Sequence, residues 1–166
     1  MNSSPINSLN SSAWIAIRRG RGDDATAAVE RAIGHAERLV ADDEVNLEWK
    51  ETLVAALTVR AELALGRGRA AAALADLDRA VAQARVAIAA SPESAVWAML
   101  AAETRFARAR AIRALGAAAT AAQRETGQED LAAAYQGLDA LVELGRLAAE
   151  RQPLWTRVKT ARLRTP

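Results

Sequence analysis

The sequence predicts an all-α protein built from stacked helical units, and three observations support this. Alanine, which has the highest helix propensity, supplies about a quarter of the 166 residues. Prolines number only four, and β-branched residues do not cluster. Residues 13–45 and 61–93 align at a spacing of 48, with 11 of 33 pairs identical. Such a period is typical of supersecondary units that stack because none can bury its apolar face alone.

Helical periodicity, capping residues and turn glycines predict six to seven helices after a flexible Asn/Ser-rich leader at residues 1–9. An aspartate within the acidic run 42–44 is expected to cap the third helix. Ser91, followed by Pro92 at the first helical position, is expected to cap the fifth. Thr126 and Glu129 have capping-box spacing and would start the sixth. The expected helices cover about 10–19, 23–41, 43–65, 69–90, 92–115, 127–151 and 153–164.

The period groups these helices into a single helical-repeat domain over residues 10–166. Its units are expected at about 10–44, 45–91 and 92–152, followed by a terminal helix at 153–164. Residues 138–153 align with 77–92 at an offset of 61 rather than 48. This larger offset predicts an insertion over about 117–129 in the third unit.

The segment GRAAAALADLDRA at 68–80 resembles a tetratricopeptide repeat. Pro92 follows seven residues later than the family pattern expects, which is about two helical turns and implies an elongated helix pair. The resemblance implies antiparallel helical hairpins stacked as a short right-handed solenoid. It also implies a non-catalytic scaffold or adaptor that binds a partner peptide or helix, as long-helix variants do in bacterial regulators. The matching positions are Gly68, Ala73, Leu74, Leu77, Asp78, Arg79 and Ala80.

Composition argues against several other classes of protein. The chain has no cysteine, so disulfides and thiolate metal sites are excluded. No signal peptide and no apolar run long enough to span a membrane is recognisable, so a soluble, cytoplasmic protein is expected. Basic and acidic residues alternate in blocks around a net charge of +2, which argues against a nucleic-acid-binding face.

The sequence predicts neither an enzyme nor a cofactor or metal site. His35 is the only histidine, and no nucleophile or carboxylate pattern accompanies it. The acidic residues at 42–44 are consecutive, and consecutive side chains rarely converge on one ion. We therefore expect no catalytic residue.

Tryptophan and arginine recur with the same period of 48, as Trp49 and Trp97 and as Arg60 and Arg108. In each helix the two residues are eleven positions apart, about three turns, which places them on one side. Tryptophan and arginine are enriched at binding hot spots, so this side predicts a partner groove lined by the first helix of each hairpin. In the alternative interpretation the tryptophans are wedges between hairpins that the arginines cover. The candidate partner-binding residues are Trp97, Arg105, Arg108, Trp49, Arg60 and Trp155.

A second class of function stays open at this point. Trp14 and Trp155 lie in terminal helices that lack a full partner, so self-association through one end of the molecule is also expected to be feasible. The alternative to a scaffold is therefore an oligomerising helical bundle with a structural or chaperone-like role.

Overall fold

The computed structural model describes residues 22–164, and this part of the chain is all-α. The described part contains six α-helices and no strand. The all-α prediction is therefore confirmed there, whereas the expected leader and first helix at residues 1–19 lie outside the described residues. The helices are α2 Gly22–Asp42, α3 Leu47–Gly66, α4 Ala70–Ala90, α5 Ala95–Leu115, α6 Ala121–Glu143 and α7 Gln152–Leu163, with short 3-10 helices at Gly116–Ala118 and Ala149–Arg151.

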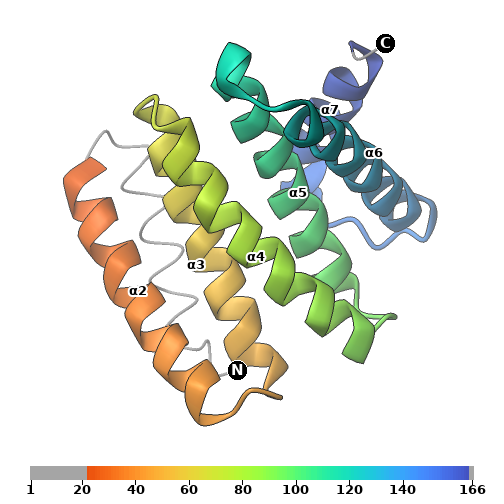
Figure 1. Cartoon of the computed structure of the whole chain (residues 1–166). Coiled ribbons are helices and arrows are strands. Elements are labelled where there is room, and N and C mark those ends of the chain that lie inside the picture. The colour runs from red at the N-terminus through yellow and green to blue at the C-terminus, as the bar shows by residue number, and fades with distance from the viewer. Residues whose placement is uncertain (1–21, 165–166) are drawn as a thin grey trace.

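Each helix packs against the next one in the chain, and α3 also packs against α5 (Figure 1). Three groups of buried side chains fill the spaces between them. The first, around Val29 and Leu57, joins α2, α3 and α4 to the start of α5. The second, around Leu77 and Ile112, joins α3, α4 and the end of α5. The third joins α5, α6 and α7 around Leu138.

The apolar stripes that predict the second and fourth helices are the faces that these helices bury. On α2 the buried side chains recur at helical spacing, and on α4 the same spacing continues along most of the helix. Each fully buried leucine or valine stabilises the fold by about 1.5–3 kcal/mol. These side chains are Val29, Ala32, Ile33 and Ala36 on α2, and Ala70, Leu74, Leu77, Val81 and Ala84 on α4.

Two helices begin later than the sequence analysis predicts, because the expected caps already end the preceding helix. Asp42 is the last residue of α2, and the backbone N–H of Asp43 donates to the Leu39 carbonyl. The cap of α3 is therefore Asn46, whose side chain accepts from two backbone N–H groups of the first turn. In the same way the N–H of Ser91 donates to Ala87 at the end of α4. Ser94 caps α5 instead.

The sixth helix also differs from its prediction, at both ends. Its cap is Thr120, which exchanges side-chain hydrogen bonds with Gln123 in a capping box, so the predicted cap at Thr126 is wrong and that residue lies inside α6. The helix ends at Glu143 rather than near 151, because Gly145 adopts a left-handed conformation with φ +64°. The helices α4 and α6 begin at positions 70 and 121, which is only slightly more than one period apart. Residues 121–129 of the expected insertion form the first turns of α6, and the insertion itself stays a prediction.

Candidate functional site

Arg60 on α3 and Arg108 on α5 each hold two neighbouring helices through carboxylates. Arg60 Nε and Nη2 donate to both carboxylate oxygens of Asp76 on α4, at 2.8 and 2.6 Å, and Nη1 donates to Glu30 on α2 at 2.8 Å. We call each such set, with one arginine and two acids, an arginine bridge.

The second arginine bridge repeats the first one period later in the chain. Arg108 makes the same two-pronged contact with Asp130 on α6, and its Nη1 donates to Asp78 on α4 at 3.1 Å. Glu30 and Asp78, like the two arginines, are separated by the period of 48. The period seen in the sequence therefore corresponds to a repeated contact between helices.

The arginine bridges contain two of the predicted partner-binding residues, Arg60 and Arg108. The hydrogen bonds to Asp76 raise the pKa of Arg60 above its ordinary value, and those to Asp130 do the same for Arg108. Asp130 is only 2% exposed, so Arg108 is the main partner that offsets the burial of this carboxylate. The two guanidinium groups are engaged within the fold, and their contact with a partner stays a prediction.

The predicted tryptophans lie in three different surroundings. Trp97 on α5 is 4% exposed and belongs to the core, in agreement with the packing interpretation. Trp49 on α3 is half-buried. Trp155 on α7 is half-buried as well, and its ring lies 5.1 Å from the ring of Tyr135 on α6. The structure does not bring the three together in one surface.

Arg105 is the predicted site residue that lines an open surface. It is on α5, and with side chains of α4 and α6 it lines a groove of about 410 Å³ that is floored by α5. We call this surface the α4–α6 groove. A small hollow that shares Ile88, Ala101 and Arg105 with the groove continues it along α4 to Arg85. The groove is lined by Ile88, Pro92, Ala98, Ala101, Ala102, Arg105, Ala133, Gln136 and Gly137.

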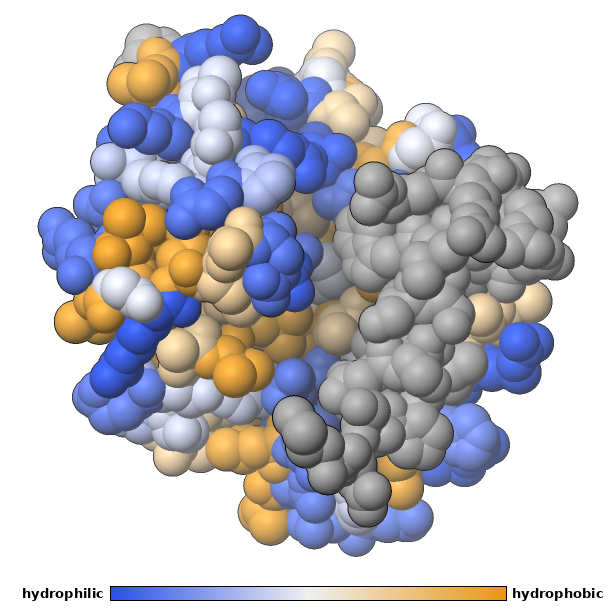
Figure 2. Space-filling model, turned by 180° about the vertical axis from the view of Figure 1, so that it is seen from behind, coloured by the Kyte–Doolittle hydropathy of each residue, from blue (hydrophilic) through white to orange (hydrophobic). Residues whose placement is uncertain are grey.

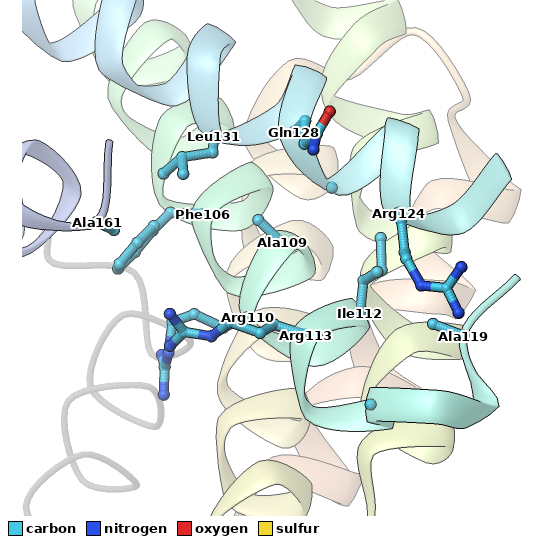
Figure 3. A pocket seen from close by; sticks show the side chains of 12 residues that line it. Phe106, Ala109, Arg110, Ile112, Arg113, Ala119, Arg124, Gln128, Leu131 and Ala161 are labelled. Carbon is cyan, nitrogen blue, oxygen red and sulfur yellow. The ribbon is translucent and has the colours of Figure 1, made fainter. Parts of the chain in front are cut away.

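A second hollow, which the sequence analysis missed, lies where α5, α6 and α7 meet (Figure 3). We call it the α5–α7 pocket; its volume is about 360 Å³. Small residues leave this space open, since Gly127 on α6 has no side chain to extend toward Ile112 on α5. The run of small residues at 116–119 and Gly127 is the sequence signal that could have indicated it. The apolar lining includes Phe106, Ala109, Ile112, Ala119, Leu131 and Ala161.

Arginines surround this apolar lining. Figure 3 shows Ile112 between Arg113 and Arg124, and Arg110 on the same side as Arg113. Arg110 is fixed by an ion pair with Glu62 on α3, and its guanidinium lies 5.8 Å from the Phe106 ring centroid. Seen from behind, the side of the molecule formed by α5, α6 and α7 carries apolar surface with hydrophilic side chains around it (Figure 2).

One acidic group near this end of the molecule is partly buried. Glu103 on α5 accepts from Arg151 at 2.9 Å. Burial raises the pKa of Glu103, and this effect outweighs the opposing attraction of Arg151. The pair links α5 to the segment that precedes α7.

The described residues hold no group of three or more His, Cys, Asp or Glu side chains placed to bind a metal ion. His35 is exposed on α2. Within residues 22–164, every helix is too short or too polar to cross a membrane.

Comparison with known proteins returned no matching family, no matching curated protein and no matching solved structure. The helices define the class of the described part, which is all-α. Among the described residues, the α4–α6 groove and the α5–α7 pocket are the candidates for function.

Proposed function

We propose that the chain is a non-catalytic scaffold that binds a helix or peptide of a partner protein. In this proposal α3 with α4, and α5 with α6, form tetratricopeptide-like hairpins stacked as a short right-handed solenoid. Two observations support the stacking. The arginine bridges recur with the period of the sequence, and α3 packs on α5 as the first helices of neighbouring hairpins would.

The α4–α6 groove is the observation that carries the binding proposal. Its floor consists of small side chains on α5, among them Ala98 and Ala101, so a partner helix can approach closely. Arg105 on this floor has a side chain 30% exposed, and Arg85 stands on the adjoining part of α4. Arginine next to an apolar floor is typical of interface hot spots, and it favours a partner with acidic side chains.

Site-specific crosslinking in the native host tests this proposal. A photo-crosslinking phenylalanine derivative is placed at Gln136, which is exposed and lines the groove, and for comparison at His35, which is exposed on α2. We expect position 136 to capture a defined protein that position 35 does not. Capture of nothing, or of the same proteins at both positions, contradicts the proposal.

Charge reversal then tests the chemistry of the contact. Arg85→Glu with Gln136→Glu reverses the charge of the groove, and Arg38→Glu with Gln152→Glu makes the same charge change at exposed positions of α2 and α7. We expect only the first pair to abolish capture of the partner by affinity purification. If the captured protein is a second copy of the chain, and light scattering shows a closed oligomer, the structural alternative holds instead.

A further inference from the structure

We propose that the α5–α7 pocket binds a small organic anion, a carboxylate carried on an aromatic or aliphatic body. This ligand site is separate from the α4–α6 groove and does not depend on the scaffold function. The volume of about 360 Å³ falls within the usual range for small-molecule sites, roughly 300–1,000 Å³. Such sites combine a mainly apolar lining with a few polar groups that orient the ligand, which is the composition found here.

The apolar part of the pocket has a defined shape. Phe106 and Leu131 lie at one end and Ile112 at the other, with Ala109 between them (Figure 3). The guanidinium groups of Arg110 and Arg157 lie 5.8 and 5.5 Å from the Phe106 ring centroid. These contacts hold the ring in place, so a ligand meets a preformed apolar surface.

The charges at the pocket favour an anion. Three arginines and no acidic residue are among the described residues that line it. Within the same part of the chain, Arg113 and Arg124 form no ion pair, whereas Arg60, Arg108 and Arg110 are each paired with a carboxylate. A carboxylate lying at the mouth would accept charge-assisted hydrogen bonds from these guanidinium groups, which a neutral ligand of the same shape could not do as strongly.

Charge complementarity also distinguishes between possible occupants. Residues 1–21 carry three arginines and no acidic residue, so the charge of this segment does not complement the arginines of the pocket. The pocket is bounded by α5, α6 and α7, and its volume of about 360 Å³ suits a small molecule. A small anion satisfies both the size and the charge.

The experiment uses the full-length protein and the fluorescent probe 1-anilinonaphthalene-8-sulfonate, which joins an aromatic body to an anion. We expect saturable binding at one site, measured by fluorescence titration, while near-UV circular dichroism shows that tertiary packing is intact. That second measurement matters because the probe also binds loosely packed states. Displacement is then compared for 4-phenylbutyrate and 4-phenylbutan-1-ol, which differ in the charged group. We expect the acid to displace the probe at a concentration at least about tenfold lower.

Two variants locate the site. Arg113→Ala with Arg124→Ala removes these two charges from exposed positions, and we expect at least about tenfold weaker binding of the acid with little change for the alcohol. Gly127→Leu fills the pocket beside Ile112, and we expect it to abolish binding of both. The matched controls are Arg38→Ala with Arg146→Ala, at exposed positions elsewhere, and Gly34→Leu, at a position where an added Cβ meets no atom within 4 Å.

Each result of these binding measurements either supports the proposal or overturns it. Loss of acid binding in the double arginine variant, with binding retained in both controls, supports the proposal. Equal displacement by the acid and the alcohol, or unchanged affinity after removal of both arginines, overturns it. Displacement by an acidic helical peptide but not by 4-phenylbutyrate also overturns it and makes the pocket part of a protein interface.

Discussion

The arginine bridge between α5 and α6 makes a quantitative prediction. Arg108→Met keeps most of the side-chain stem, which packs against its neighbours, and removes the charge that faces Asp130. Since Asp130 is 2% exposed, its carboxylate is left buried without its main partner. Breaking a buried pair in this way costs about 3–5 kcal/mol. Arg105 Nη1 lies 4.0 Å from Asp130 and can replace part of the contact, so we expect the lower end, about 3 kcal/mol.

The assay is urea unfolding followed by far-UV circular dichroism, with the free energy of unfolding obtained by linear extrapolation. Arg79→Met is the control, because Arg79 and Glu37 form an exposed pair with side chains 50% and 43% accessible. We expect that change to cost less than about 1 kcal/mol. Replacing both members of the buried pair, Arg108→Met with Asp130→Leu, should recover much of the loss. The reasoning fails if Arg108→Met costs no more than the control, or if the double variant shows no coupling.

Three further predictions concern local features of the fold. In chemical denaturation, Gly34→Ala should stabilise α2 by roughly 0.5–1 kcal/mol, since the new methyl meets open space, and Gly68→Ala should destabilise because φ is +71° there. Thr120→Ala should lower the free energy of unfolding by about 1 kcal/mol because it removes the helix cap, whereas Thr126→Ala should leave it unchanged or raise it. A larger loss for Thr126→Ala than for Thr120→Ala would contradict the observed start of α6. The pKa of Glu103 is higher in the folded than in the unfolded chain, so stability should fall as pH rises from the ordinary glutamate pKa through the folded one. Glu103→Gln should remove that fall in a series of thermal melts, and an unchanged pH dependence would refute it.

The positions of the long helices could be predicted because their signals are local. The expected fourth helix over 69–90 is observed as Ala70–Ala90, since a turn at Gly68 and an apolar stripe determine both its start and its buried face. The buried stripe of α2 follows from the same periodicity. A helix with one apolar face has only one side that can be placed on the core.

Helix caps were less predictable because several residues of the right type compete for each position. Ser91 and Ser94 are both suitable caps, and so are Asp43 and Asn46. The choice depends on where the preceding helix ends, which is a property of packing. Thr120 and Gln123 have the capping-box spacing too, so the sequence carried the correct signal for α6 beside a second one.

The two open surfaces could not be derived from the sequence, because each depends on how far neighbouring helices diverge. Small residues at 116–119 and at Gly127 are compatible with a tight contact as well as with a pocket. Arg105 was predicted to contact a partner, and the structure adds the groove that surrounds it. Alanine-rich helices make this ambiguity general, since an alanine face fits both close packing and an exposed surface.

The arginine bridges show why a repeat can be visible in a sequence while the structural role of the repeated residues is not. Arg60 and Arg108 recur at 48, but their main partners, Asp76 and Asp130, are 54 positions apart. An alignment at a fixed period therefore matches the arginines, Glu30 and Asp78 but misses the two buried aspartates. Arginines without a visible partner suggest a binding face, whereas the same arginines with buried aspartates hold three helices together. Once these four residues are assigned to the fold, the described charges that line the two hollows are the arginines of the α5–α7 pocket and Arg85 and Arg105 at the α4–α6 groove.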